Sequence, residues 1–255
     1  MPLNDIAAAI ITRNAAETLS KTLDSLRDFP EVVIYDNGSV DGTEAIAKRY
    51  ANVRYFSGDF LGFGPSKNRA AELAERDWIL SIDADEQASP ELVAELAGLA
   101  LDDNRYLGEV LRRNFMLGKH VRHSGWGNDW LPRIYNKQFH RYNDANVHER
   151  ILPRDGSDMR RLRGVLNHDA VRELGSFLVK IDRYTAIRAA DASSALPVPI
   201  IYLKSLWAFF RVFVLQAGFL DGWRGLVIAW CDATGVFFKY MRAVAKLRSQ
   251  DGMKQ

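Results

Sequence analysis

An alternation of short apolar runs with segments of helical periodicity occupies the first hundred residues of this chain and limits the folds open to it. The apolar runs are four to seven residues long and rich in Ile, Val and Ala, which predicts buried strands. Strands are predicted at residues 6–12, 31–35, 53–56 and 78–82, and helices at 17–26, 43–50 and 67–74. This order predicts an α/β fold, a Rossmann-like, mostly parallel sheet flanked by helices.

Polar residues follow three of the predicted strands, at the point where each strand ends. They are residues 12–14, 36–39 and 83–86. In parallel sheets with helices on both faces, ligands bind beyond the carboxyl ends of the strands. The sequence therefore predicts a ligand site at this edge of the sheet.

The third of these segments contains two carboxylates with a chemical use. Asp83 and Asp85 are two residues apart, so in extended backbone they point the same way. A hard divalent cation takes oxygen ligands and keeps positions for phosphate oxygens, and it can neutralise a diphosphate leaving group. We therefore expect Mn²⁺ or Mg²⁺ here. The alternative is that the acids cap a helix beginning at Pro90, a role that Glu86 and Ser89 also suit.

The second half of the chain changes character twice. Residues 105–170 are less periodic and rich in Gly, Asn, His, Trp and Arg, as in a region of strands and loops around a site. From residue 171 onward the pattern is helical. We therefore expect a nucleotide-binding and catalytic domain over residues 1–170 and a helical C-terminal region over residues 171–255.

The C-terminal region is basic and amphipathic. Residues 160–255 carry 15 Lys and Arg against 7 Asp and Glu, while the rest of the chain carries 19 against 25. Residues 200–215 are apolar almost all round, with Lys204 and Arg211 on one face, and residues 223–248 combine an apolar stripe with a basic face. Neither segment has the ~18–20 uncharged residues of a spanning helix, so a helix in the membrane interface is expected. Packing on the sheet or on a second subunit is the alternative.

Several segments resemble a known family. Residues 35–43 (YDNGSVDGT) resemble the D-x-G-S-x-D-G-T segment of the family 2 glycosyltransferases, which have the GT-A fold. Residues 62–70 (GFGPSKNRA) and 78–86 (WILSIDADE) are similar to a narrower branch, the small bacterial transferases of lipopolysaccharide-core and related surface-glycan synthesis. The resemblance covers residues 6–240.

The resemblance implies a set of donor contacts. Thr12 and Asn14 would lie along the nucleotide, and Lys67 would approach the diphosphate. Asp36 would accept a hydrogen bond from uracil, since a carboxylate can accept from the imide N–H; its alternative is a turn residue. Ala15 stands where the family usually has an acid, which leaves donor contacts at this corner open.

The resemblance also implies the metal ligands. Asp83 would lie near both the ribose and the metal, and Asp85 would be the principal ligand. Some GT-A enzymes complete the metal site with a downstream histidine, and His168 is the candidate for that position. A satisfied core or loop histidine is the alternative.

An inverting transfer also needs a general base and an acceptor site. The base takes the proton of the acceptor hydroxyl, and Asp129 and Glu149 are the candidates. Asp129 is preferred because, with Arg133, it partly matches the Glu-Asp pair that many family members carry upstream of an arginine, although the register differs. By the same resemblance, Trp126, Arg133 and His148 are expected to bind the acceptor.

These features predict an inverting hexosyltransferase that uses a nucleotide sugar, with a UDP-sugar expected. Its acceptor would be a lipopolysaccharide core or another glycan or glycolipid. We expect it at the cytoplasmic face of the bacterial inner membrane, as a peripheral protein and a possible homo-oligomer with no nucleic-acid partner; the one cysteine, Cys231, suits a reducing compartment.

Three alternatives remain open. A polyprenyl-phosphate sugar synthase would share the fold and the metal site. A nucleotidyltransferase would carry a glycine-rich basic loop after the first strand, and residues 12–16 are not one. A non-enzymatic nucleotide or RNA-binding module would interleave aromatic and basic residues on a sheet face.

Overall fold

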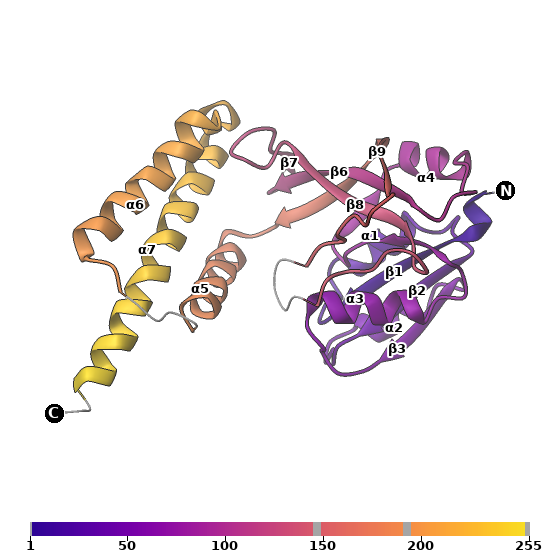
Figure 1. The fold of residues 1–255 in the computed structure, drawn as a ribbon, viewed down its shortest axis with the longest axis horizontal. Helices are drawn as coiled ribbons and strands as arrows, with labels where there is room; N and C mark the ends of the chain where they lie inside the picture. Colours follow the sequence, from indigo (N-terminus) through magenta and orange to yellow (C-terminus); the bar gives the residue numbers. More distant parts are fainter. Residues whose placement is uncertain (1, 145–148, 191–194, 253–255) are drawn as a thin grey trace. The chain divides into compact units, whose positions relative to one another are not determined.

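The computed structural model describes residues 2–144, 149–190 and 195–252 of the chain (Figure 1). It contains two compact units. The first is formed by Met1–Arg113 with Asp129–His168, and the second by Asn114–Asn128 with Asp169–Gln255.

The predicted parallel strands form one half of the sheet in the first unit. They are β1 (Ile6–Thr12), β2 (Glu31–Asp36), β3 (Val53–Ser57) and β4 (Trp78–Ser81), in the spatial order β3-β2-β1-β4. The first, second and fourth are almost wholly buried, which explains why their sequences are continuous apolar runs without alternation. The predicted α/β class is confirmed.

Helices cover both faces of these strands. On one face, α1 (Leu19–Asp24), α2 (Thr43–Ala47) and α4 (Pro90–Ala97) pack against side chains such as Ile10 and Ile34. On the other face, α3 (Phe63–Glu72) packs against Ala9 and Val33. The helix α3 begins four residues before the predicted start. Pro65 permits this earlier start because it lies in the first turn, where its missing N–H costs no helical hydrogen bond.

Antiparallel strands extend the sheet beyond β4. The strand β8 (Asp129–Asn136) pairs antiparallel with β4 and with β6 (Tyr106–Met116). Beyond β6 lies β9 (Asp158–Val171), which pairs antiparallel with the short β5 (Glu86–Ala88). Since β8 runs opposite to β4, its first residues lie at the edge where the parallel strands end.

The second unit is mainly helical. It contains α5 (Leu174–Ala190), α6 (Val198–Phe210), the π-helical turn Arg211–Leu215 and α7 (Trp223–Gly252), with β7 (Lys119–His120) paired to the end of β6. Small residues let α6 and α7 approach closely, and the Ser205 hydroxyl donates to the Ala233 carbonyl at 2.8 Å. The interior includes Met116, Val171, Val212 and Ile228.

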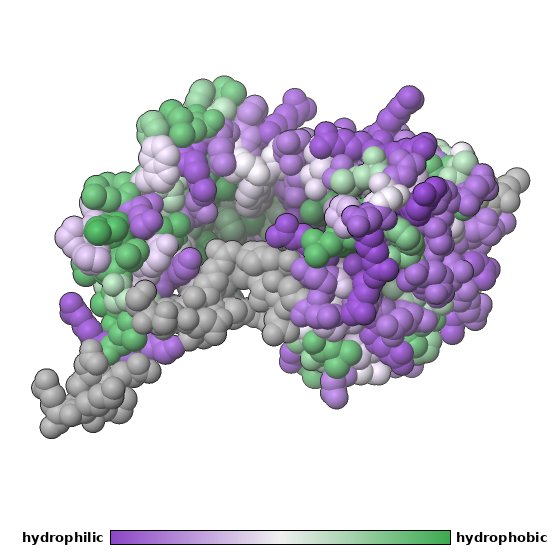
Figure 2. Space-filling model, viewed as in Figure 1, coloured by the Kyte–Doolittle hydropathy of each residue, from purple (hydrophilic) through white to green (hydrophobic). Residues whose placement is uncertain are grey.

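One side of α6 is exposed although its residues are apolar. The 18 residues Val198–Leu215, which include Lys204 and Arg211, pass a test of length and composition for a helix that could cross a membrane. Within the structure, 17% of that segment is buried. Figure 2 shows green, apolar surface where α6 lies in Figure 1. The exposed large residues of the helix are Val198, Ile200, Tyr202, Leu203, Leu206, Trp207 and Phe210.

Candidate active site

The loops that follow β1 and β2 are tied together by polar contacts. Asn14 adopts a left-handed backbone conformation with φ of 54°, and its side-chain oxygen accepts from the Val40 amide at 2.9 Å. The Asn14 amide donates to the Ser39 hydroxyl at 2.8 Å. The predicted nucleotide contacts Thr12 and Asn14 therefore lie beside the loop that contains Asp36.

Asp36 organises the turn that follows β2. Its Oδ1 accepts from the Gly38 and Ser39 amides at 2.8 and 2.7 Å, and its Oδ2 accepts from the Ser39 hydroxyl at 2.5 Å. Burial first, and then the charge of Asp36, raise the pKa of the nearby Tyr55 phenol. The turn role of Asp36 is thus visible in the structure, while its predicted contact with uracil stays a prediction.

Thr12 presents a polar atom with no partner. The residue is buried at the end of β1, and its Oγ1 forms no hydrogen bond within the part of the chain that the structure describes. A buried hydroxyl without a partner is costly, so such groups usually meet water or a ligand. A polar ligand bound at this edge of the sheet could therefore form a hydrogen bond with the Thr12 Oγ1.

A chain of alternating charges crosses the same edge of the sheet. Asp83, just beyond β4, is 2.8 Å from the Lys67 ammonium through Oδ1 and 2.9 Å from the Arg133 guanidinium through Oδ2. Lys67 is also 3.2 Å from the Glu149 carboxylate. Arg133 of β8 is also 2.7 Å from Glu86 of β5. Residues from four separate segments therefore meet around Asp83.

Two more residues continue this chain. Arg112 of β6 is 3.3 Å from the Glu86 carboxylate and 2.7 Å from the Asp129 carboxylate. The order is Glu149, Lys67, Asp83, Arg133, Glu86, Arg112 and Asp129, and we call this set the charge chain. Both predicted bases, Asp129 and Glu149, form its two ends.

The charge chain fixes the ionisation of its central members. Burial alone would raise the pKa of Asp83, but the Lys67 and Arg133 charges outweigh it and hold that pKa well below its usual range. Burial alone would lower the pKa of Lys67, and the Asp83 charge reverses this and raises it. Asp83 and Lys67 are therefore both charged at neutral pH.

This balance changes the reason for expecting a metal. The sequence suggested that neighbouring acids need a cation to offset their repulsion. In the structure, side-chain cations compensate Asp83 and Glu86, so repulsion between acids gives no support for a metal. The expected role of Asp83 as a metal ligand stays a prediction, and both of its oxygens already lie within ion-pair distance of Lys67 and Arg133.

Asp85 and His168 are brought together by strand pairing. In the antiparallel pair of β5 and β9, Glu86 lies opposite His168, so the preceding residue, Asp85, reaches the same imidazole. The Asp85 Oδ2 lies 3.4 Å from the His168 Nε2, and the Asp85 side chain is 42% exposed. Within the described residues, no group of three or more Asp, Glu, His or Cys side chains could hold a metal.

The three predicted acceptor-binding residues lie in different surroundings. Arg133 is buried between Asp83 and Glu86. Trp126 belongs to the second unit, where it packs edge-on against Phe177 with ring centroids 6.1 Å apart. His148 lies outside the described residues.

Sequence reasoning missed two residues of the site and misjudged a third. Arg112 and Tyr142 carry no local signal, and Lys67 lies over the Tyr142 ring at 5.3 Å. Glu86 was considered as a cap for α4. The Ser89 hydroxyl does accept from the Leu92 amide at 3.2 Å, but Glu86 is fully buried and pairs with Arg133 and Arg112. The capping interpretation of Glu86 is wrong, because its side chain points into the charge chain.

Comparisons with known proteins agree with this architecture. The sequence model for "Glycosyl transferase family 2" matches residues 8–157. A protein described as an uncharacterized glycosyltransferase from Rickettsia felis is 28% identical, covering 96% of this chain and 90% of its own length. The lipopolysaccharide core biosynthesis glycosyltransferase LpsC of Rhizobium meliloti is 27% identical, covering 94% of each.

The structure of S. aureus TarS residues 1–349 in complex with UDP-GlcNAc has a TM-score of 0.47 and 15% sequence identity, covering 96% of this chain and 92% of that one.

Proposed function

The chain belongs to glycosyl transferase family 2, and on this premise we propose that it is an inverting hexosyltransferase that takes its sugar from a UDP-sugar. The observation that supports this best is the edge of the sheet described above: Thr12 and Asp36 end β1 and β2, Lys67 lies in α3, and Asp85 lies between β4 and β5. In open α/β sheets this is the edge at which ligands bind.

The chain's own residues would hold the nucleotide diphosphate as follows. The Thr12 hydroxyl, which lacks a partner in the described residues, would gain one from the nucleotide. Lys67 stays protonated because Asp83 raises its pKa, so it can offer a positive charge to the diphosphate. Asp36 would accept from the base, and its turn contacts hold that carboxylate in a fixed orientation.

A divalent cation fits this site. Asp85 and His168 offer one carboxylate oxygen and one imidazole nitrogen from a partly exposed position, which leaves room for phosphate oxygens and water. These two residues would hold Mn²⁺ or Mg²⁺. When bound, the cation would offset the negative charge that develops on the nucleoside diphosphate as it leaves.

A panel of nucleotide sugars tests the donor and metal proposals together. With UDP-glucose, UDP-galactose, UDP-GlcNAc and GDP-mannose, each with Mn²⁺, Mg²⁺ or EDTA, we expect slow release of one nucleoside diphosphate. That release should fall at least about a hundredfold in EDTA, because the leaving group loses its counter-charge. An equal rate in EDTA would remove the metal from the proposal. GDP release in place of UDP release would contradict the uridine assignment.

The base is proposed to be Asp129. An inverting transfer needs a carboxylate that takes the proton of the acceptor hydroxyl. Asp129 begins β8 at the ligand edge, and Arg112, at 2.7 Å, orients its carboxylate. Glu149, by contrast, contacts the same Lys67 that is assigned to the diphosphate, so we assign Glu149 to the donor side.

Matched substitutions separate the two carboxylates. Asp129→Asn should lower kcat by roughly 10² to 10⁴ with little change in the KM for the donor, because it removes a proton acceptor. Glu149→Gln should instead alter the donor KM, because Lys67 loses one of its two carboxylate neighbours. Steady-state kinetics with each variant give the two constants. The opposite pattern would make Glu149 the base.

The acceptor is proposed to be a lipopolysaccharide core or a related glycolipid at the inner face of the bacterial inner membrane. The full-length similarity to LpsC supports the acceptor class. The exposed apolar side of α6 and the basic residues Lys204 and Arg211 support a membrane location, since such a helix binds well at an anionic lipid surface (Figure 2).

A further inference from the structure

The second unit contains a cavity that is lined by none of the residues proposed to bind the donor, hold the metal or act as the base. It has a volume of about 630 Å³ and lies between α5, α6 and α7, with Trp126 at one end. This is within the roughly 300–1,000 Å³ of typical small-molecule pockets. We call it the helical pocket.

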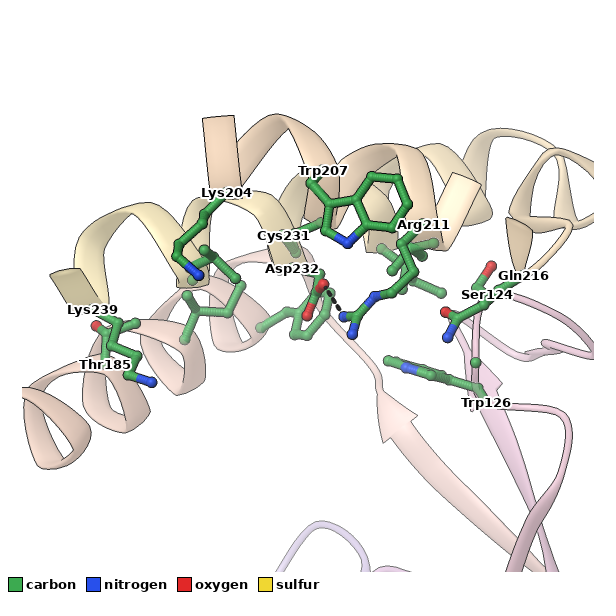
Figure 3. A pocket seen from close by; sticks show the side chains of 18 of the residues that line it. Ser124, Trp126, Thr185, Lys204, Trp207, Arg211, Gln216, Cys231, Asp232 and Lys239 are labelled. Atoms are coloured by element: carbon green, nitrogen blue, oxygen red, sulfur yellow. Dashed lines mark hydrogen bonds and ion pairs between the residues drawn. The ribbon is translucent and has the colours of Figure 1, made fainter. Parts of the chain in front are cut away.

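Positive charge gathers in the helical pocket. Lys204 extends into it from α6, Arg211 from the π-helical turn that follows α6, and Lys239 lines it from α7 (Figure 3). Arg211 is paired with Asp232 at 2.9 Å, and Asp232 is the one carboxylate among the lining side chains that the structure describes. Among those described side chains, three cations against one anion leave a net charge of +2.

Two of these cations have no carboxylate partner among the described residues. Within the described part of the chain, neither Lys204 nor Lys239 forms an ion pair, and both lie over the Tyr240 ring, at 5.9 and 4.9 Å. Two ammonium groups beside one aromatic ring repel each other unless an anion lies between them. A phosphate group would offset this repulsion, and its oxygens accept from lysine readily.

The surroundings of the pocket narrow the kind of anion. Trp207 lines the pocket and is also exposed, and it continues into the exposed apolar residues of α6, including Leu203 and Phe210. A free sugar phosphate or a nucleic acid would leave this apolar surface in water. An amphiphile would cover it, because its headgroup and its chains meet the two kinds of surface at once.

We propose that the helical pocket binds the phosphate-bearing headgroup of an anionic membrane lipid, with Lys204 and Lys239 contacting the phosphate and the acyl chains lying along α6. The proposal rests on the membrane location proposed above and adds a defined headgroup site to it. It does not depend on which sugar the enzyme transfers.

Titration of the full chain with a short-chain lipid tests the site without a membrane. Dihexanoyl phosphatidic acid, kept below its micelle concentration, should change the tryptophan fluorescence, and dihexanoyl phosphatidylcholine should not. The double variant Lys204→Ala/Lys239→Ala should bind the anionic lipid about thirtyfold more weakly. A control, Arg122→Ala/Arg248→Ala, removes the same charge from exposed positions that do not line the pocket, and its affinity should change less than about twofold.

Three results would overturn the headgroup site: equal loss in the two double variants, equal binding of the two lipids, or displacement of the lipid by inorganic phosphate at the same concentration. Sedimentation with vesicles of phosphatidylglycerol and phosphatidylcholine separates this proposal from the membrane location. Pelleting with vesicles but no binding of the short-chain lipid would support the membrane location and contradict the headgroup site in the helical pocket. Short-chain binding without pelleting would overturn both the membrane location and the headgroup site that rests on it, leaving only an anion-binding pocket. Nucleoside diphosphate release tests the transferase independently of both.

Discussion

Substituting Asp85→Ala should reduce sugar transfer by about a thousandfold or more while leaving the protein folded, because a metal ligand contributes several kcal/mol to the transition state and little to the fold. The Asp85 side chain is 42% exposed and lies 3.4 Å from His168. Removing an exposed side chain of this kind usually changes the free energy of unfolding by about 0.5 kcal/mol or less.

Three measurements define this test: initial rates with saturating donor, Mn²⁺ affinity in the presence of UDP, and the thermal midpoint. Rate and affinity should both fall, and the midpoint should stay within about 2 °C. Asp155→Ala, at an exposed position of the same unit, is the matched control and should behave as wild type. Wild-type rates in Asp85→Ala would remove Asp85 from the metal assignment. A rate that falls while the Mn²⁺ affinity stays unchanged would give Asp85 a role other than holding the metal.

The adjacent residue should give the opposite result. We expect Glu86→Ala to lower the free energy of unfolding by about 3–5 kcal/mol, because it leaves the buried Arg133 with one carboxylate in place of two. Glu86 is fully buried, 2.7 Å from Arg133 and 3.3 Å from Arg112, and it accepts from the Asp83 amide at 2.9 Å. Glu86→Ala therefore removes contacts to β8, to β6 and to the backbone of Asp83 at once.

Urea unfolding and the thermal midpoint measure this effect. A loss of 3–5 kcal/mol corresponds to a fall of roughly 10 °C in Tm for a chain of this size. Glu86→Gln keeps the shape and one acceptor oxygen, so it should be destabilised less than Glu86→Ala. A change below about 1 kcal/mol in Glu86→Ala would mean that the charge chain contributes little to stability. Taken together, substitutions at residues 85 and 86 separate the chemistry of this segment from its structural role.

The charge chain also separates the carboxylates of residues 83–86 into two groups with different surroundings. In the segment that follows β4, Asp83 and Glu86 are turned towards Lys67, Arg133 and Arg112, whereas Asp85 is turned towards His168. The inward pair joins β4 and β5 to β6, β8 and α3. This fixes the backbone from which Asp85 extends, so its position depends on rigid elements more than on a flexible loop.

The sequence alone determined the parallel half of the sheet, the edge at which its polar residues gather, and the family. Strands β1, β2 and β4 were predicted because continuous burial on both faces requires continuous apolar runs. Asp83 and Asp85 were found because they follow one of those strands, and Lys67 because it lies in a short segment that resembles the family. Each of these signals is contained within about ten residues of chain, as are the periodicities on which they depend.

Only the tertiary structure decided what these side chains meet. His168 reaches Asp85 because β9 pairs with β5, and Arg133 and Arg112 reach Glu86 because β8 and β6 add antiparallel strands beside β4. The partners are separated by 26 to 83 residues. Strand register between such distant segments is set by the packing of the whole sheet, and a side chain in a strand changes face with a shift of one residue. Local sequence therefore shows which groups can carry charge, and the pairing of distant strands determines which of them are neutralised and which remain to bind a ligand.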